Sequence, residues 1–324
     1  MKAIVVREPG PPEVLELKDV ESPSPGPNEV LIKVAAAGIN RADVLQRQGH
    51  YQSQPGVSDI LGLEVSGTIA QVGAEVSNWE LDDPCVALLT GGGYAEYVAA
   101  PAGQVVPPPL GVELAAAASV IEVAATVYSN IELIGLADGD CLLVHGGAGG
   151  VGSFAIQYAK SLGATVITTA GTEDKLGYCR SIGADHAISY RSDWASAVRE
   201  IASEGVHMIL DNMGAKYLAD HVELLAMDGA LVNIGLQGGR KGTLDLSSLA
   251  SKRGLITANL LRRRSVEQKS AICRGLVQNV WPLIADGTIK QSPLTVFPLA
   301  DAASAHARLE SGGNIGKIIL SVSR

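Results

Sequence analysis

A glycine-rich turn between an apolar strand and a helix constrains the fold more than any other segment. Residues 141–157 read CLLVHGGAGGVGSFAIQ, in which Gly147, Gly149 and Gly152 form the pattern G-x-G-x-x-G. In a doubly wound α/β fold, such a turn presents backbone N–H groups to the pyrophosphate of a dinucleotide. Gly147 permits the tight turn, Gly149 removes a Cβ that would block the phosphate, and Gly152 lets the helix pack closely on the strand. With a second strand at 164–170, the segment predicts nucleotide binding; the alternative is a glycine-rich turn without a ligand.

Length and composition predict a compact globular protein with two domains. Its 324 residues exceed one ordinary core, and 47% of them are hydrophobic while 18% are charged. A net charge of −9 argues against a nucleic-acid surface. The basic run 262–264 is typical of a solvated helix start or of a phosphate contact. The four scattered cysteines indicate a reducing compartment, and neither the N-terminus nor the apolar run 114–121 predicts a signal peptide or a membrane span. We therefore expect a cytoplasmic protein.

Two sequence patterns divide the chain. The first third alternates short β-rich segments with proline and glycine, which predicts a mostly antiparallel β domain with strands at 3–6, 30–34, 64–72 and 94–99 and a short helix at 41–46. From residue 114, strand and helix alternate, which predicts a parallel sheet with crossover helices. Its expected strands are 141–145, 165–170, 187–189, 207–211, 230–234 and 255–258, and its expected helices are 114–134, 151–162, 172–182 and 217–225. A helix at 266–284 and a last strand at 317–322 follow, and that strand is expected to return to the first domain. The expected domains are therefore 1–122 with 264–324, and 123–263.

The end of the second strand of the parallel sheet favours NADPH over NADH. A site for NAD usually has an acidic residue about 20 residues past the glycines, where it holds the ribose 2′-hydroxyl. Here residues 168–172 read TTAGT, without an acid, and Lys175 follows within one helical turn, where its charge can balance a 2′-phosphate. An ordinary surface lysine is the alternative. Glu173 and Asp174 are either first-turn helix acids or ligands, and Tyr190 can close the adenosine side.

Motifs for several other chemistries are missing from the sequence. It has no H-E-x-x-H, no Cys/His cluster with zinc spacing and no G-x-S-x-G, and no carboxylate pair stands out for glycosidic chemistry. Its six histidines are dispersed and are expected to be mostly structural or solvated. A nicotinamide carries hydride chemistry by itself, so the protein needs only to position it and shield it.

Segments along nearly the whole chain resemble one family. They are AGINRADVLQRQG at 37–49, ILGLEVSG at 60–67, GGGYAEYV at 91–98, VHGGAGGVG at 144–152 and NIGKI at 314–318. They are similar to the zinc-independent, zeta-crystallin-like quinone oxidoreductases of the medium-chain dehydrogenase/reductase superfamily, and most of all to the branch that contains the p53-inducible quinone oxidoreductase. The resemblance implies a Rossmann NADPH-binding domain beside a GroES-like catalytic domain, with the active site in the cleft. It also implies a homodimer, joined at the strand 255–258.

The same resemblance implies a site without metal. Zinc-dependent relatives carry a cysteine at the position of Asn40, within one residue of alignment, and a histidine at that of Leu63. Their structural-zinc lobe of four cysteines has no counterpart in this sequence. Glu64 remains from the zinc motif, and we expect it to be a buried carboxylate paired with a neighbour such as an arginine.

The resemblance also supplies candidate site residues. Asn40, Asp43 and Tyr51 are expected to line the nicotinamide and substrate pocket as catalytic residues, with Tyr51 as either a proton donor or a stacking wall. The expected cofactor contacts are Tyr51, Ala148, Gly149, Gly150, Val151, Gly152, Gly171, Thr172, Lys175, Tyr190, Asn212, Gly235, Leu236, Leu260, Arg262 and Asn314. Two segments depart from the family: LDDPCV at 81–86 replaces a Gly-Asp-Arg-Val turn, and SVIEV at 119–123 replaces a proline- and aromatic-rich stretch that often faces substrate. A less bulky substrate pocket is therefore expected.

The reaction that the resemblance implies is metal-independent hydride transfer from NADPH to a quinone or a related conjugated carbonyl. The proton comes from a side chain or from solvent. Two alternatives remain open from the sequence. One is reduction of the C=C bond of an enone or enoyl thioester by the same hydride, and the other is a non-catalytic NADPH-binding protein of crystallin or sensor type. Neither membrane nor nucleic acid is an expected partner.

Overall fold

The computed structural model describes residues 1–51 and 56–322, and its chain forms two compact units. Unit 1 comprises Met1–Ala125, Arg262–Gly287 and Gln291–Arg324, and unit 2 comprises Thr126–Leu261 and Thr288–Lys290. The expected domain boundaries, after residues 122 and 263, lie within three residues of the two main divisions. The short segment Thr288–Lys290, which belongs to unit 2, was not expected there.

Unit 2 is built on a six-stranded parallel sheet with the order β10-β9-β8-β11-β12-β13. The strands are β8 (Cys141–His145), β9 (Thr165–Ala170), β10 (His186–Ser189), β11 (Val206–Asp211), β12 (Leu225–Asn233) and β13 (Leu255–Ala258). Apolar side chains from both its strands and its helices form one core that includes Leu143, Ile167 and Trp194. Central parallel strands are buried on both faces, which is why β8 has four consecutive apolar residues before His145 and is buried throughout. The predicted Rossmann-type sheet is confirmed.

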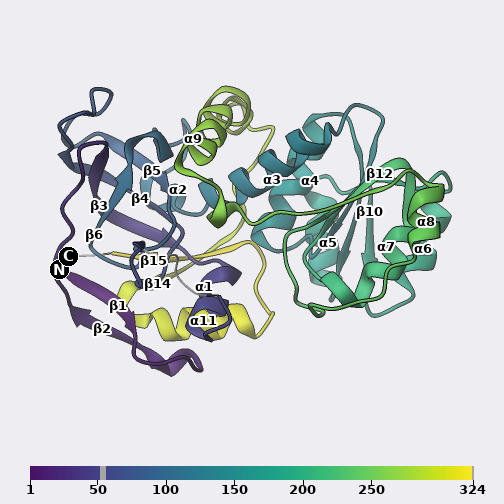
Figure 1. Ribbon diagram of the computed structural model, residues 1–324, viewed down its shortest axis with the longest axis horizontal. Helices are drawn as coiled ribbons and strands as arrows, with labels where there is room; N and C mark the ends of the chain where they lie inside the picture. Colours follow the sequence, from purple (N-terminus) through teal and green to yellow (C-terminus); the bar gives the residue numbers. More distant parts are fainter. Residues whose placement is uncertain (52–55, 323–324) are drawn as a thin grey trace. The chain divides into compact units, whose positions relative to one another are not determined.

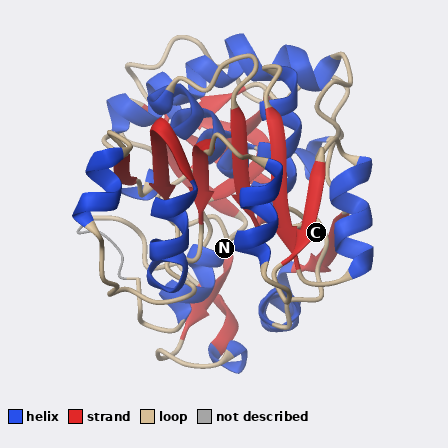
Figure 2. Ribbon diagram, turned by 90° about the vertical axis from the view of Figure 1, so that its right-hand side faces the viewer, coloured by secondary structure: helices blue, strands red, loops and turns tan. Residues whose placement is uncertain are grey.

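Helices lie on both faces of the sheet of unit 2 (Figures 1 and 2). They are α4 (Gly150–Ser161), α5 (Glu173–Ser181), α6 (Trp194–Ile201), α7 (Leu218–Leu224), α8 (Leu246–Ser251) and most of α3 (Ile121–Ile134). The sequence did not predict α6 and α8. Asp193 accepts a hydrogen bond from the Ser196 amide at the start of α6, and Asp245 caps α8 in the same way. Both helices are shorter than the ten to twelve residues, roughly, from which a helix can be told from a strand by its sequence pattern.

Unit 1 contains a seven-stranded, mostly antiparallel sheet and a separate two-stranded one. The larger sheet has the order β14-β15-β3-β4-β5-β7, with β6 also paired to β3, and the smaller consists of β1 and β2. The strands are β1 (Lys2–Val6), β2 (Leu15–Asp19), β3 (Glu29–Gly38), β4 (Glu64–Val72), β5 (Pro84–Leu88), β6 (Tyr97–Pro101), β7 (Val105–Val106), β14 (Leu294–Pro298) and β15 (Lys317–Ser321). The C-terminal strand β15 pairs with β3, so its predicted return to the first domain is confirmed. The predicted GroES-like β domain is confirmed as well.

Short helices complete unit 1, and several of them differ from the expected ranges. They are α1 (Arg41–Arg47), α2 (Leu114–Ala117), α9 (Val266–Gly275), α10 (Trp281–Ala285) and α11 (Ala302–Glu310). The helix expected at 114–134 is interrupted by a turn at 118–120, and the one expected at 266–284 contains a π-helical segment, Leu276–Val280. Pro282, which lacks an N–H donor, lies just after that segment. The strand expected at 94–99 starts only at Tyr97. The sequence did not predict β2, β5, β7, β14 or α11.

Among the described residues, one segment is long and apolar enough to cross a membrane by length and composition alone. It is Leu114–Ile134, which spans 21 residues, and 78% of its most apolar window is buried inside the structure. A core helix shows the same burial, so this segment is weak evidence for a membrane span.

Candidate functional site

The glycine-rich turn of unit 2 connects β8 to α4 and has the geometry expected for a phosphate site. Gly149 is the N-cap of α4, and no described side chain caps this helix. A Cβ at Gly147 would lie 2.1 Å from the Thr168 hydroxyl oxygen, and one at Gly152 would lie 2.3 Å from the Gly146 carbonyl oxygen, so packing requires both glycines. A Cβ at Gly149 would be no closer than 3.5 Å to any atom, which is ordinary contact. Packing alone therefore does not require a glycine at position 149. A ligand that approaches the start of α4 would require one.

The second strand, β9, ends beside a tyrosine. A Cβ at Gly171 would lie 2.2 Å from the hydroxyl oxygen of Tyr190, so the phenol packs directly against the glycine backbone. Tyr190 follows β10, the strand next to β9, and its side chain is 47% exposed. The two expected cofactor contacts thus lie together at the same end of the sheet, where an aromatic face remains accessible.

The start of α5 contains the residues expected to distinguish NADPH from NADH. Thr172 is its N-cap, and the Thr172 hydroxyl oxygen accepts a hydrogen bond from the backbone N–H of Lys175 at 3.5 Å. Lys175 is half-buried. Glu173 is exposed and forms an ion pair with Arg180 at 2.7 Å, two turns along the same helix. The Glu173 carboxylate is therefore engaged by its own helix, as expected for a first-turn acid.

The loops after β11, β12 and β13 contain four further expected cofactor contacts. The Asn212 side-chain amide donates to the carbonyl oxygen of His145 at 3.3 Å. Its oxygen Oδ1 is buried without a hydrogen-bond partner among the described residues, and a buried acceptor of this kind is costly unless a ligand pairs with it. Gly235 packs against the Asn212 backbone, while Leu236 and Leu260 are about half exposed. The residues present in unit 2 therefore fit a dinucleotide.

Two histidines that are far apart in the sequence meet beneath this region. His145 and His221 are joined by a hydrogen bond of 2.8 Å between their Nε2 atoms, and Trp194 and Tyr217 pack around them. Burial, and then the neighbouring His221, lowers the pKa of His145 to about 3, so the pair is neutral at ordinary pH. A structural role fits these histidines, as expected.

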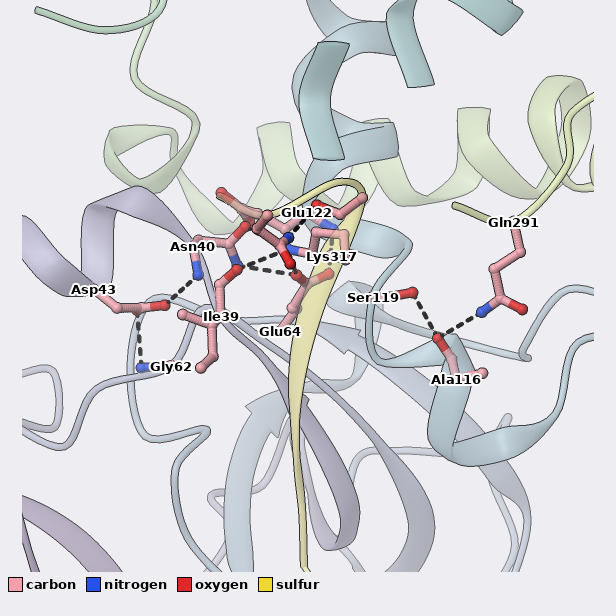
Figure 3. Close-up of polar contacts among 12 residues, drawn as sticks. Ile39, Asn40, Asp43, Gly62, Glu64, Ala116, Ser119, Glu122, Gln291 and Lys317 are labelled. Carbon is pink, nitrogen blue, oxygen red and sulfur yellow. Dashed lines mark hydrogen bonds and ion pairs between the residues drawn. The ribbon is translucent and has the colours of Figure 1, made fainter. Parts of the chain in front are cut away.

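A cluster in unit 1 joins the half-buried Asn40 to the buried Glu64 and Lys317 (Figure 3). The Lys317 ammonium donates to the Glu64 carboxylate at 2.6 Å, to the Asn40 side-chain oxygen at 2.7 Å and to the Ile39 carbonyl oxygen at 3.0 Å. The Asn40 amide nitrogen donates in turn to Glu64 at 2.9 Å. Glu64 is thus a buried, paired carboxylate as expected, but its partner is a lysine and not the arginine suggested above. Lys317 was missed as a site residue, although the segment NIGKI contains it.

Close packing of backbone allows this cluster to form. A Cβ at Gly38, the last residue of β3, would lie 2.2 Å from Glu64 Oε1 and 2.4 Å from the Ala118 carbonyl oxygen. The glycine therefore gives the carboxylate its place between β3 and the turn that precedes α3.

Asp43 holds the start of α1 in place. Its carboxylate accepts hydrogen bonds from the backbone N–H of Asn40 at 2.8 Å, the backbone N–H of Gly62 at 3.2 Å and the Tyr94 hydroxyl at 3.1 Å. Burial raises the pKa of Asp43 to about 6, against these three donors. Asp43 thus orients Asn40, and the direct ligand contact expected of it remains a prediction.

Tyr51 lies in unit 1 against the buried cation of Arg262. The Arg262 guanidinium is 5.0 Å from the centre of the Tyr51 ring, within the range of a cation–π contact. Arg262 also donates to the Thr90 carbonyl oxygen at 2.7 Å, and Lys269 donates to the Thr90 hydroxyl at 2.5 Å. Burial raises the pKa of Tyr51, with Arg262 opposing the shift. The structure therefore shows Tyr51 as a stacking partner of Arg262.

Asn314 is the last expected cofactor contact, and its side chain forms hydrogen bonds with neighbouring residues of unit 1. Its side-chain amide donates to the Gly316 carbonyl oxygen at 3.0 Å, and its oxygen accepts from the Thr295 hydroxyl at 3.4 Å. These contacts shape the turn before β15.

No group of three or more His, Cys, Asp or Glu side chains with metal-site geometry occurs among the described residues.

Comparisons with known proteins agree with this architecture. Residues 26–110 match the family model "Alcohol dehydrogenase GroES-like domain", and residues 150–274 match "Zinc-binding dehydrogenase". The solved quinone oxidoreductase of Escherichia coli, complexed with NADPH, superposes with a TM-score of 0.91 at 28% identity and covers 99% of this chain and 100% of its own. A mycobacterial protein complexed with NADPH has a TM-score of 0.89 at 32% identity, with the same coverage.

The curated relatives are much longer proteins. A mycocerosic acid synthase-like polyketide synthase of Mycobacterium tuberculosis is 33% identical over 98% of this chain. The chain spans 15% of the length of that relative.

Proposed function

We propose that this chain, which belongs to the medium-chain dehydrogenase/reductase superfamily, is an NADPH-dependent oxidoreductase that reduces a quinone or a related conjugated carbonyl. The observation that carries the proposal is Gly149, at the uncapped start of α4, where packing leaves space for a Cβ. Within the superfamily we place the chain among the zinc-independent quinone oxidoreductases, in the branch of the p53-inducible enzyme. The NADPH in the E. coli quinone oxidoreductase structure supports this choice of cofactor.

Unit 2 contributes the cofactor-binding residues in this proposal. When bound, NADPH supplies a hydride from its nicotinamide ring. The start of α4 holds the pyrophosphate through backbone N–H groups and the helix dipole. Lys175 and the Thr172 cap lie where a 2′-phosphate would find a positive charge and a hydroxyl. The unpartnered Asn212 oxygen accepts a donor of the cofactor.

Unit 1 contributes the polar groups for the acceptor. The Asn40 side chain is fixed at both ends, because its oxygen accepts from Lys317 and its nitrogen donates to Glu64. A fixed amide dipole stabilises developing negative charge on a carbonyl oxygen without reorganising. Tyr51 provides a flat wall for a planar acceptor, backed by Arg262.

A second candidate is reduction of a conjugated C=C bond. The polyketide synthase relatives favour it, since this chain aligns with a segment of those proteins over almost its whole length. The cofactor site would be the same, and only the acceptor atom that receives the hydride would differ.

Steady-state oxidation of NADPH by the full chain tests the proposal. The acceptors are 1,2- and 1,4-quinones, an enone and an enoyl thioester, each measured against a blank without protein. We expect quinones to be reduced well above the blank. Rapid reduction of the enone or thioester with quinones at background would favour the second candidate. Tight NADPH binding without turnover of any acceptor would favour a non-catalytic NADPH-binding protein.

Replacing Lys175 by alanine is expected to weaken NADPH binding by about 1–3 kcal/mol, or roughly fivefold to 150-fold, and to leave NADH nearly unchanged. The reason is that only NADPH carries the 2′-phosphate that this ammonium would contact. Calorimetric titration with each cofactor measures the difference. Lys18→Ala, an exposed lysine of β2 in unit 1, is the control and should change neither affinity. An equal loss for NADPH and NADH would contradict the assignment.

We also propose that the protein is a homodimer joined at β13. This strand is the edge of the sheet of unit 2, and Leu255 at its start is half exposed. A free strand edge offers unpaired backbone groups to a second copy. Sedimentation at micromolar concentration should show two chains, and a monomer would refute the dimer.

A further inference from the structure

Glu122 is a half-buried acid in the first turn of α3, beside the Asn40–Glu64–Lys317 cluster (Figure 3). We infer that it donates the proton that completes the reduction proposed above, an inference that rests on that function. It lies in the segment SVIEV, which replaces the stretch that often faces substrate in the family that this chain resembles.

Contacts from three segments fix the position of Glu122. Its backbone N–H donates to Glu64 Oε2 at 2.9 Å. The turn before it is held at the Ala116 carbonyl oxygen, which accepts from the Ser119 hydroxyl at 2.7 Å and from the Gln291 side chain at 3.0 Å (Figure 3). The side chain therefore starts from a rigid backbone, as a proton donor requires.

The carboxyl group of Glu122 has no hydrogen-bond partner among the described residues, although several charges surround it. The nearby cations are committed to other acceptors: Lys317 to Glu64 and Asn40, and Lys269 to the Thr90 hydroxyl. The titratable and charged groups that face it are Glu64 on β4, Asp43 on α1, Lys317 on β15, Lys269 and Cys273 on α9, and Arg262 and Tyr51. It is therefore an acid without a salt bridge.

Its surroundings favour the neutral form. Burial first, and then the charge of Glu64, raises the pKa of Glu122 to about 8, with Lys317 and Lys269 opposing. The N-terminal end of α3 also favours the carboxylate, but a helix dipole shifts a pKa by less than about one unit. Glu122 is thus protonated at neutral pH and can donate.

The other acids nearby are less suited to this step. Burial raises the pKa of Tyr51 above its usual value, which makes the phenol a weaker acid. Asp43 already accepts three hydrogen bonds and is fully buried. A donor is most efficient when its pKa lies near the working pH, and Glu122 alone of the three meets this condition without a bound partner.

The step balances in atoms and electrons. The acceptor gains a hydride from NADPH, that is, one hydrogen with two electrons, and negative charge develops on its oxygen. The O–H bond of Glu122 breaks and a new O–H bond forms on the acceptor, which leaves a carboxylate. Water returns the proton to Glu122. The sum is acceptor, NADPH and one proton giving reduced acceptor and NADP⁺.

The test compares Glu122→Gln with the wild type in quinone or enone reduction from about pH 6 to pH 10. Wild-type kcat should fall above a pKa of about 8, as the acid form is lost. In the variant, kcat should drop by about a hundredfold and lose this alkaline limb, because general acids contribute about 10²–10⁴. KM and NADPH affinity should stay within about twofold, because glutamine preserves the shape. Glu132→Gln, exposed on the same helix, is the control.

Infrared titration supplies a second readout that does not need turnover. The wild type should show a protonated carboxyl band that titrates near the same pH and is absent from Glu122→Gln. If that variant does not fold, Glu122→Asp, which keeps the acid but retracts it, should lower kcat and keep the alkaline limb. A wild-type enzyme that reduces quinones or enones, with the limb retained in Glu122→Gln, would overturn the role of Glu122 alone. No turnover of any conjugated carbonyl by the wild type would overturn the proposed function, and the role of Glu122 with it.

Discussion

Replacing Gly152 by alanine is expected to reduce NADPH affinity by more than about a hundredfold. The new Cβ would lie 2.3 Å from the Gly146 carbonyl oxygen and 2.6 Å from the Gly147 Cα, and both are backbone atoms. Neither backbone atom can shift to make room unless the whole turn moves away from the start of α4. Hydrogen bonds to a charged group contribute about 1.5–3 kcal/mol each, so misplacing two of them costs about 3–6 kcal/mol.

A matched glycine substitution separates this effect from a general one. Gly177 lies within α5, and a Cβ there would meet no atom within 4 Å. Gly177→Ala should leave NADPH affinity unchanged and stabilise the helix slightly, by about 0.5–1 kcal/mol. Titration by nucleotide fluorescence gives the affinities, and circular dichroism shows whether each variant is folded. A folded Gly152→Ala variant that binds NADPH within about threefold of the wild type would contradict the assigned phosphate site.

Replacing Lys317 by methionine is expected to destabilise the protein by about 3–5 kcal/mol. The ammonium is the ion-pair partner of Glu64, at 2.6 Å, and both side chains are almost fully buried. Its loss leaves a carboxylate in a low-dielectric environment, where the Asn40 amide and the Glu122 backbone N–H are its remaining donors among the described residues. Denaturant unfolding, followed by tryptophan fluorescence, measures the change.

A double mutant tests whether the uncompensated charge is the cause. Adding Glu64→Gln to Lys317→Met removes the buried charge, so the double variant should recover part of the lost stability. Lys2→Met is the control, because the Lys2–Asp19 pair at 2.7 Å is exposed on both sides. Exposed pairs contribute about 0.2–1 kcal/mol. If Lys317→Met lowers the free energy of unfolding no more than the control does, the buried ion pair stabilises the protein no more than an exposed one.

The sequence predicts unit 2 better than the cluster of unit 1. Strands β8, β9 and β13 have the bounds that were expected, because a short run of apolar and β-branched residues between glycines or polar turns is a local signal. The phosphate turn is also local, since its glycines follow one another within a single strand–turn–helix unit. By contrast, Lys317 and Glu64 are 253 residues apart, and neither has a neighbour in sequence that indicates its partner.

Two further features that the sequence did not predict also depend on residues far apart in the chain. The turn at 118–120 interrupts an apolar run that looks helical throughout, because the Ser119 hydroxyl and Gln291 compete for the Ala116 carbonyl oxygen. That competition involves a residue from far along the chain. The turn places Glu122, whose neighbours come from β4, β15 and α9, so its environment could not be read from SVIEV alone.

Titration of the wild-type chain with NADPH and, separately, with NADH tests the central claim most directly, because every later step depends on the cofactor. Isothermal calorimetry gives both affinities without any assumption about the acceptor. The phosphate turn and Lys175 predict that NADPH binds, and that NADH binds about fivefold to 150-fold more weakly. Absence of binding by either nucleotide, or tighter binding of NADH, would contradict the account.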